Sequence, residues 1–188
     1  MPKTIIAISG KRKSGKDYCT NVIKEAFEKC NVSVSTSGIS HSLKEEYAKT
    51  HGLNFDELLT DGPYKERFRK DMIRWGEDAR SKDSGIFCRA AIDSVSESDV
   101  VIISDCRRTT DYAYFRSNYR TLTIRVETSE EDRKQRGFRF VEGIDDVESE
   151  CGLDNYNYDI VLKNLTEGNL APQVEQIVET VLNLINKS

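Results

Sequence analysis

Short apolar runs alternate with amphipathic stretches along the whole chain. Runs of the buried-strand type lie at residues 4–9, 32–36, 100–104, 122–127 and 159–162, and each is expected to form a strand. Segments with helical spacing separate these runs. Strands that alternate with helices predict an α/β fold with three layers, α/β/α, around a central parallel sheet.

Helices are expected where apolar residues recur at every third or fourth position. The clearest case is residues 64–80, which also carry Arg69 and Arg80 about three turns apart, so that both are expected to point to one side. The apolar stripe of this helix consists of Tyr64, Phe68, Met72, Trp75 and Ala79. Further helices are expected at 17–29, from Ser42 to a stop at Gly52, from Asp83 or Ser84 to about Val95, and at 109–118, 129–136 and 170–185. Residues 138–157 are polar and acidic and are expected to be irregular.

Composition narrows the class of protein. The 188 residues fit one domain that is long enough to bury a core. The formal net charge of −4 argues against nucleic acid as the main partner, because domains that bind it usually carry a basic excess. The five cysteines are scattered and are expected to be reduced thiols. The chain has no apolar run of membrane length, and its start is too short for a signal peptide, so a cytosolic protein without a membrane partner is expected. A monomer is also expected.

Residues 8–21, ISGKRKSGKDYCTN, follow the first apolar run and carry the first functional pattern. They fit the phosphate loop G-x-x-x-x-G-K-[ST] at Gly10, Gly15 and Lys16, in the required order of strand, loop and helix. Glycines let successive N–H groups point at phosphate oxygens, and Lys16 would reach the β and γ phosphates. The alternative is a basic turn between a strand and a helix. Three more basic residues crowd the loop: Lys11, Arg12 and Lys13.

Asp17 stands where the pattern expects Ser or Thr. The usual hydroxyl binds Mg²⁺, and a carboxylate oxygen also suits this hard cation, directly or through water. An acidic side chain at the start of a helix is favourable by itself as well. Both roles for Asp17, metal ligand and helix cap, stay open.

The third apolar run is followed by SDCRR at residues 104–108. Ligands of open parallel sheets bind at the carboxyl ends of the strands, so Arg107 and Arg108 are expected to face a transferring phosphoryl group. Surface arginines in a loop are the alternative. Asp105 would orient Mg²⁺, an arginine or the loop itself, and the sequence does not choose among these.

A third basic cluster, RKQRGFR at residues 133–139, adjoins a long polar loop. The pattern is typical of a mobile lid over ATP, with a solvated surface helix as the alternative. His41 and His51 lie in a polar connecting region and form no recognisable catalytic set. A hydroxyl acceptor usually requires a catalytic base, whereas a phosphate acceptor requires only positive charge that holds two anions together. The basic clusters favour a phosphate acceptor.

Several of these stretches together resemble the animal-type phosphomevalonate kinase family. The similarity runs in order from about residue 4 to 164, and the most specific stretches are RKDMIRWGE and ESECGLDN. The stretches that carry it are GKRKSGKD at 10–17, HGLNF at 51–55, YKERFRKDMIRWGEDAR at 64–80, SDCRR at 104–108, RKQRG at 133–137 and DDVESECGLDN at 145–155. A loop ending in Asp is the form this family uses, whereas Phe138 stands where the family has Trp.

The resemblance implies a P-loop NTPase fold of the nucleoside monophosphate kinase type. It also implies transfer of the γ-phosphoryl group of ATP, with Mg²⁺, to (R)-5-phosphomevalonate, giving 5-diphosphomevalonate and ADP in isoprenoid, sterol and cholesterol biosynthesis. One kinase domain, 1–188, is expected. Its parts would be a core of 1–39, 97–128 and 156–188, an acceptor-binding region of 40–96 and a lid of about 129–155.

The same resemblance implies roles for individual residues. For ATP it implies Gly10, Lys11, Arg12, Lys13, Ser14, Gly15, Lys16, Asp17, Arg133 and Arg136. For 5-phosphomevalonate it implies Lys65, Arg69, Arg80, Arg107, Arg108 and Asn164. The catalytic set would be Lys13, Lys16, Arg107 and Arg108, and Asp17 would bind Mg²⁺. Arg125 also matches a family arginine, but it lies in a strand pattern and its role stays open.

Two other classes of function compete with this reading. A kinase for a nucleoside monophosphate or another small phosphate ester would use the same architecture but needs aromatic stacking and hydrogen bonds for a base. The cationic stretch 64–80 suits a small doubly anionic acceptor better. A nucleotide-binding switch or scaffold is the third reading, and the chain lacks the guanine-reading N-K-x-D motif.

Overall fold

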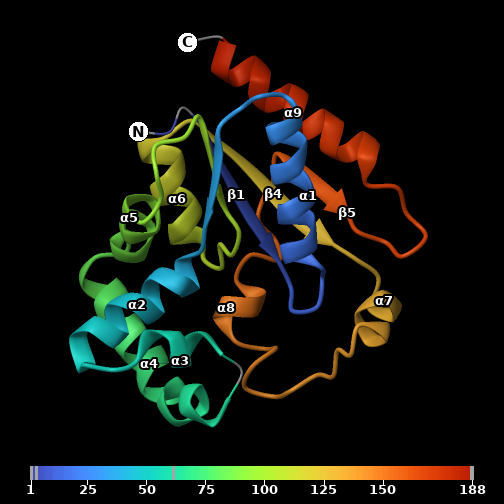
Figure 1. Cartoon of the computed structure of the whole chain (residues 1–188). Coiled ribbons are helices and arrows are strands. Elements are labelled where there is room, and N and C mark those ends of the chain that lie inside the picture. Colours follow the sequence, from blue (N-terminus) through green and yellow to red (C-terminus); the bar gives the residue numbers. More distant parts are fainter. Residues whose placement is uncertain (1, 3, 61, 187–188) are drawn as a thin grey trace.

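The computed structural model describes residue 2 and residues 4–60 and 62–186. Within them, five parallel strands form one sheet in the order β2-β3-β1-β4-β5 (Figure 1). The strands are β1 (Thr4–Gly10), β2 (Val34–Ser37), β3 (Val100–Ile103), β4 (Thr121–Glu127) and β5 (Ile160–Lys163). The central position of β1 explains why its residues 4–8 are all fully buried.

Helices connect the strands in the order that a parallel sheet requires. They are α1 (Lys16–Lys29), α2 (Ile39–His51), α3 (Phe55–Leu59), α4 (Pro63–Lys82), α5 (Ile86–Asp93), α6 (Thr109–Asn118), α7 (Glu130–Gln135), α8 (Glu148–Cys151) and α9 (Ala171–Asn186). None of the helices in the described part of the chain is both long enough and apolar enough to cross a bilayer.

The sheet is covered on both faces, which confirms the expected three layers. On one face Ile6 and Ile8 pack with apolar side chains of α1 and α9, among them Ile23 and Ile177. On the other face Ile5 and Ala7 pack with side chains of α5 and α6. The alternation within β1 is that of a strand buried on both sides, because successive side chains point to opposite faces.

Helices α2, α3 and α4 form a smaller body beside the sheet (Figure 1). Tyr47, Leu58 and Met72, one from each helix, form its buried centre. The stripe predicted for the long helix is confirmed, since Tyr64, Phe68 and Trp75 pack on this cluster, and Trp75 with Ala79 also packs on the sheet side.

Helix boundaries differ from the expected ones at a few places. The stop at Gly52 is confirmed, with a left-handed φ of 64°. The same helix begins at Ile39 and not at Ser42, because Asp105, distant in sequence, accepts hydrogen bonds from its first N–H groups. Helix α5 begins at Ile86, after a turn in which the Asp83 carboxylate accepts from Gly85 N–H at 3.0 Å.

Two short helices were not expected from the sequence. Helix α3 is a single turn whose Asn54 side chain accepts from Glu57 N–H, and α8 is a single turn within the segment expected to be irregular. Helices this short carry too few apolar positions for a periodicity to be recognised.

Candidate active site

The loop between β1 and α1 is shaped by its two glycines. A Cβ atom on Gly10 would lie 2.6 Å from Ser14 Oγ, and one on Gly15 would lie 2.1 Å from Asn164 Nδ2. Gly15 also has a left-handed φ of 82°. Both positions therefore require glycine, and the loop curls as the phosphate-loop pattern predicts. Lys13 lies exposed on the same loop with a φ of 65°.

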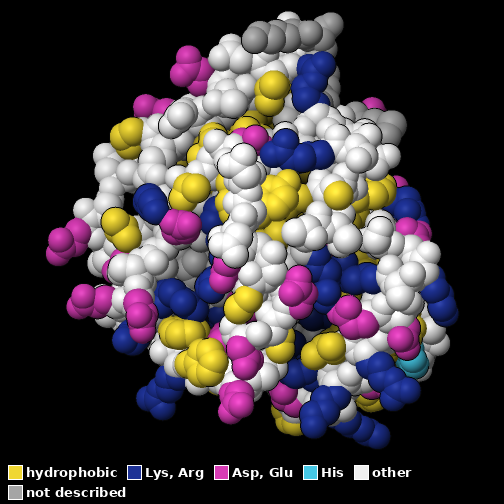
Figure 2. All heavy atoms as spheres, turned by 180° about the vertical axis from the view of Figure 1, so that it is seen from behind, with side chains coloured by type: hydrophobic (Ala, Val, Ile, Leu, Met, Phe, Trp, Pro, Cys, Tyr) yellow, Lys and Arg dark blue, Asp and Glu magenta, His cyan; other side chains and the backbone are white. Residues whose placement is uncertain are grey.

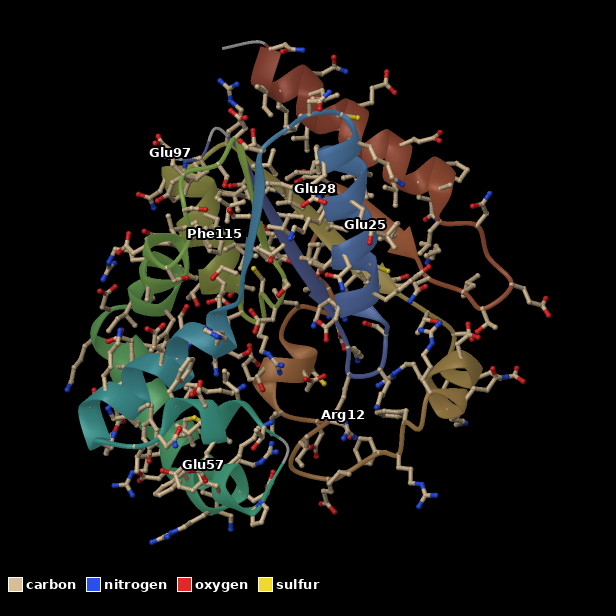
Figure 3. All side chains as sticks on the ribbon, in the orientation of Figure 1. Arg12, Glu25, Glu28, Glu57, Glu97 and Phe115 are labelled. Carbon is tan, nitrogen blue, oxygen red and sulfur yellow. The ribbon has the colours of Figure 1, made fainter. Side chains whose placement is uncertain are left out.

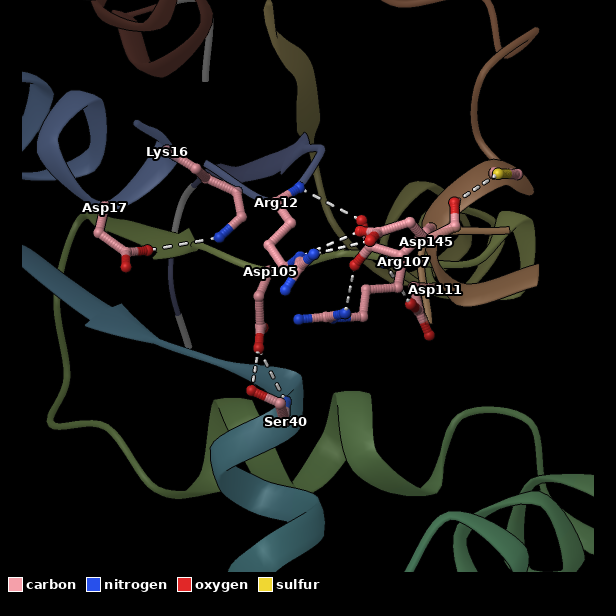
Figure 4. A network of polar contacts seen from close by, with 10 residues as sticks. Arg12, Lys16, Asp17, Ser40, Asp105, Arg107, Asp111 and Asp145 are labelled. Atoms are coloured by element: carbon pink, nitrogen blue, oxygen red, sulfur yellow. Dashed lines mark hydrogen bonds and ion pairs between the residues drawn. The ribbon is translucent and has the colours of Figure 1, made fainter. Parts of the chain in front are cut away.

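Lys16 and Asp17 open helix α1 beside this loop. Lys16 Nζ lies 3.3 Å from Asp17 Oδ1, and the Asp17 side chain is 91% exposed (Figure 4). Both residues border a cavity of about 780 Å³. The carboxylate is therefore open to a ligand, and it sits at the positive end of the α1 dipole.

The larger cavity lies between α1, the start of α2 and the turn that follows β3. The turn contributes Asp105 and Arg107, and α2 contributes Ser40, His41 and Lys44. Cations and hydroxyls from separate elements thus face one space. The expected acceptor-binding region, 40–96, contains most of α2, but the sequence did not single out any residue of this helix. Only the fold brings Gly38 and the following helix to the end of β3.

A second cavity, of about 700 Å³, lies on the other side of the loop. It is bordered by Gly15, Arg136 and Asn164, with apolar walls that include Val22 and Leu170. Asn164 Nδ2 donates to Ser14 O at 2.8 Å, and Arg136 Nη2 donates to Asn164 O at 3.1 Å. The carboxyl end of β5 is therefore joined to the loop on this side.

Two arginines of the predicted lid contact the phosphate loop. Arg133 Nε donates to Arg12 O at 3.0 Å, and Arg136 Nη1 donates to Ser14 O at 3.0 Å. Phe138, where the family has Trp, lies with its ring centre 3.7 Å from the Arg133 guanidinium carbon. Two segments that are far apart in the sequence are thus in contact, and the role of residues 129–155 as a lid stays a prediction.

Acidic residues at the far end of the lid pair with the cations of the loop. Arg12 donates to both carboxylate oxygens of Asp145, at 3.0 and 2.6 Å, and lies between loop and lid (Figures 3 and 4). Lys11 pairs with Asp154 at 2.6 Å. Glu150 accepts from Arg12 N–H at 3.2 Å and from Arg107 Nη1 at 3.0 Å. Sequence reasoning missed these pairs, since charge alone does not show which acid meets which base.

The two arginines after β3 point to different neighbours. Arg107 borders the larger cavity, whereas Arg108 pairs with Glu77 of α4. Their N–H groups both donate to the Asp111 carboxylate at 3.0 Å. Sequence reasoning also missed Asp111, although its place three residues after Arg108 is that of a capping-box acid.

Not all of the expected acceptor residues meet at the larger cavity. Arg80 pairs with Asp111 at 2.9 Å and borders a separate cavity of about 260 Å³. Arg69 donates to Glu66 on its own helix, and neither it nor Lys65 borders the larger cavity. Asn164 lies with Arg136 on the opposite side of the loop. Roles for these residues in binding 5-phosphomevalonate stay predictions.

Two residues whose roles were open have structural partners. The Asp105 carboxylate accepts from the N–H groups of Ile39 and Ser40, at 2.5 and 3.0 Å, and thereby fixes the start of α2 (Figure 4). Arg125 is buried in β4, where it donates to Asp154 at 2.8 Å and to Ser9 at 3.3 Å. Arg125 therefore joins the segment around Asp154 to the sheet.

The Cys106 thiol, in the turn after β3, is not ionised. Cys106 is buried, and burial, together with the nearby charges of Asp111 and Asp105, raises the pKa of its thiol well above the ordinary value. The thiol therefore stays protonated at neutral pH.

Charges on the surface are locally balanced. Basic and acidic side chains are interspersed over the face shown in Figure 2.

Comparisons with known proteins agree with this geometry. Residues 8–121 match the family described as phosphomevalonate kinase. The chain is 42% identical over 168 residues to the phosphomevalonate kinase of Drosophila melanogaster. The aligned region covers 85% of this chain and 87% of that protein.

Solved structures show the fold at lower identity. The APS kinase of Mycobacterium tuberculosis, in complex with AMPPNP and APS, has a TM-score of 0.51 and 13% identity over 97% of this chain and 99% of that chain. A shikimate kinase from Acinetobacter baumannii, in complex with shikimate, has a TM-score of 0.51 and 11% identity over 97% of this chain and 94% of that chain. These likenesses show a P-loop kinase fold with a three-layer α/β/α architecture.

Proposed function

The chain belongs to the phosphomevalonate kinase family, and we propose that it transfers the γ-phosphoryl group of ATP to the phosphate of (R)-5-phosphomevalonate. The products are 5-diphosphomevalonate and ADP, in the mevalonate route to isoprenoids and sterols. The observation that carries the proposal is the phosphate loop with a cavity on either side of it. Two substrates can therefore approach the loop from opposite sides.

ATP is assigned to the side of Gly15, Arg136 and Asn164. The cavity there has apolar walls suited to a base, and it reaches the loop where the N–H groups and the α1 dipole favour phosphate. Arg136 and Arg133 would neutralise phosphate charge from the lid. The position of Asn164 favours contact with ATP over contact with the acceptor.

The acceptor is assigned to the cavity bordered by Lys16, Arg107 and Ser40. Phosphomevalonate carries a phosphate and a carboxylate, and this cavity offers cations and hydroxyls from three separate elements. An anionic phosphate is already nucleophilic, so the transfer needs no general base. Lys16 and Arg107 would hold the two anions close and stabilise the charge that develops on the transferred group.

MgATP is proposed as the form of the donor. Mg²⁺ prefers oxygen ligands, and the exposed carboxylate of Asp17 fits that preference at the rim of the acceptor cavity. In the part of the chain that the structure describes, no three His, Cys, Asp or Glu side chains form a metal-type cluster. Phosphate oxygens and water would supply the remaining ligands, and the ion would neutralise phosphate charge.

The acidic residues of the proposed lid imply that this segment changes its contacts when substrates bind. Asp145, Glu150 and Asp154 pair with Arg12, Arg107 and Lys11. The family resemblance assigns all three basic residues to the substrates. Substrate phosphates would have to replace these carboxylates, so the segment of about 129–155 would change its contacts when ATP binds. The division into core, acceptor-binding region 40–96 and lid is proposed on the same grounds.

The cellular setting is also a proposal. All five cysteines carry free thiols, which supports a reducing compartment such as the cytosol. Action as a monomer, without nucleic acid as a partner, stays a prediction from the sequence.

A panel of acceptors tests the proposal against its main rival. ADP release with MgATP is measured for 5-phosphomevalonate, mevalonate, AMP, CMP, UMP and GMP. Fast turnover with 5-phosphomevalonate alone is the expected result. Turnover with a nucleoside monophosphate instead would retain the phosphate loop but overturn the assignment of the acceptor cavity.

A further inference from the structure

A buried carboxylate stands behind the proposed acceptor site without facing it. Asp111 is the third residue of α6 and is 0% exposed. It borders neither of the two large cavities. Its place in the fold nevertheless connects three segments: α6, the turn after β3, and α4. The close-up shows it beside Arg107, on the far side from Lys16 (Figure 4).

The first connection is to the backbone of the arginine turn. Asp111 Oδ2 accepts from Arg107 N–H and from Arg108 N–H, each at 3.0 Å. Asp111 N–H in return donates to Arg108 O at 3.1 Å. The backbone of both arginines is thereby fixed to α6. The direction in which Arg107 leaves the turn, and hence its approach to the cavity, depends on these bonds.

The second connection is to α4. Asp111 Oδ1 accepts from Arg80 Nη1 at 2.9 Å, and the Arg80 side chain is only 11% exposed. Arg80 also lies over the Phe87 ring, 5.0 Å from its centre. Two opposite charges buried together compensate each other, whereas removal of one leaves the other without a partner in a poorly solvated place. Arg80 is thus the counter-ion of Asp111.

We propose that Asp111 is a positioning residue for phosphoryl transfer, and that Arg80 contributes to the transfer by keeping Asp111 in place. The inference rests on the proposed function. Asp111 holds Arg107 in the geometry in which its guanidinium borders the acceptor cavity, and Arg80 keeps Asp111 charged and in place. An arginine that the family resemblance assigns to the substrate thereby also supports the site from behind.

Asp111→Asn keeps the size of the side chain but removes the charge that holds Arg80 and both N–H groups. We expect kcat to fall by about tenfold to a hundredfold, because a displacement of about 1 Å in a catalytic group has an effect of this size. The KM for ATP should stay within about twofold of wild type. Asp159→Asn is the matched control, since Asp159 also accepts hydrogen bonds from an arginine, Arg116, and from a backbone N–H. Asp159 precedes β5 and therefore lies at the opposite end of the sheet from the site. It should leave kcat unchanged.

Variants of Arg80 separate support from substrate binding. Arg80 makes a single hydrogen bond to Asp111, which a lysine ammonium can replace, whereas a lysine cannot reproduce a two-pronged contact with phosphate. Arg80→Lys should keep most of kcat and an unchanged KM for the acceptor, and Arg80→Met should lower kcat as Asp111→Asn does. The double variant Arg80→Met with Asp111→Asn should be no worse than the worse single variant.

The opposite pattern would overturn the inference. That pattern is an Arg80→Lys variant as damaged as Arg80→Met, a raised KM for the acceptor in both, and losses that multiply in the double variant. Wild-type kinetics of Asp111→Asn would overturn it as well. If Asp111→Asn fails to fold, the two Arg80 variants still decide between the two roles of Arg80.

Amide hydrogen exchange tests the positioning role of Asp111 independently of the proposed function. In Asp111→Asn the N–H groups of Arg107 and Arg108 should exchange at least about tenfold faster, and in the Asp159→Asn control they should not. Exchange needs no substrate, so unchanged exchange would overturn the positioning role even if the wild-type chain proved inactive with 5-phosphomevalonate. Absence of that turnover, with faster exchange in the variant, would overturn the proposed function alone.

Discussion

Lys16 is the residue on which the proposed transfer depends most. Its ammonium group stands at the start of α1 and borders the cavity proposed for the acceptor, one residue from the glycine that borders the cavity proposed for ATP. Lys16→Met should lower kcat at least about a hundredfold, the usual effect of losing a preorganised charge-stabilising donor. Steady-state kinetics and circular dichroism should show lost turnover with a retained fold.

Lys24→Met provides the control for that variant. Lys24 lies on the same helix, is 39% exposed and pairs only loosely with Glu28, at 3.7 Å. Its removal should change neither kcat nor the melting temperature measurably. Turnover of Lys16→Met near the wild-type level would exclude the phosphate-loop assignment.

Arg107 and Arg108 make the second prediction at this scale. Replacement of either with Ala should remove at least about 2 kcal/mol of transition-state stabilisation, read from kcat/KM. Glu77, the partner of Arg108, is 50% exposed, so Arg108→Ala should change stability little. Glu150, the partner of Arg107, is only 11% exposed, so Arg107→Ala should also lower stability. Arg74→Ala, an exposed arginine of α4, is the control. Kinetics within twofold of wild type for both variants would remove the two arginines from the site.

Single functional residues were predictable where a sequence motif by itself implies the chemical role of each of its residues. Gly10, Gly15 and Lys16 follow from the phosphate-loop pattern, and the glycines are required by the contacts a Cβ would make. Asp111 and Asp145 were not predictable, because an acidic residue in a charged chain has many candidate partners. Burial selects the partner, and burial depends on the whole fold.

At the scale of elements, the lid carries a prediction about ATP. Arg136 lies between Ser14 and Asn164 at the border of the cavity proposed for ATP. Arg136→Ala should raise the KM for ATP at least about tenfold and change the KM for the acceptor little. Lys134→Ala, exposed on α7 and paired with Glu130, is the control. A change confined to the KM of the acceptor would show that the lid assignment is wrong.

Asp132 makes the attachment of α7 dependent on pH. A hydrogen bond from the Thr166 hydroxyl, first among several, lowers the pKa of Asp132 from 3.8 to about 2. A carboxyl group whose pKa is lower in the folded chain stabilises the fold above its unfolded pKa and loses that effect as pH falls through the folded value. Asp132→Asn should therefore destabilise the protein above about pH 4, and the difference should vanish toward pH 2.

Urea unfolding between pH 7 and pH 2 measures that difference. Glu131→Gln, exposed on the same helix, is the control and should follow wild type across the range. A difference between wild type and Asp132→Asn that stays constant down to pH 2 would contradict the role given to Asp132.

Elements were predictable to the extent that their own residues determine them. The helix at 109–118 and the stop at Gly52 are as expected, because a local apolar pattern or a left-handed glycine defines them. The start of α2 was not, since the acid that caps it comes from the turn after β3, more than sixty residues away in the chain. Local patterns do not report such contacts.

At the scale of the whole molecule, the strand order decides where the chemistry lies. β1 lies between β3 and β4, so the phosphate loop emerges between the arginine turn and the lid. Periodicity predicts the strands and a parallel sheet covered on both faces, but the order of the strands could be taken only from the family resemblance. The two cavities on either side of the loop likewise became visible only with the fold.

The central claim is that a phosphoryl group is transferred onto an existing phosphate. The most direct measurement is the ³¹P NMR spectrum of the purified protein with MgATP and 5-phosphomevalonate. The account predicts loss of the phosphomonoester signal and growth of two coupled diphosphate signals in step with ADP. A phosphomonoester signal that persists while ADP and inorganic phosphate accumulate would contradict it.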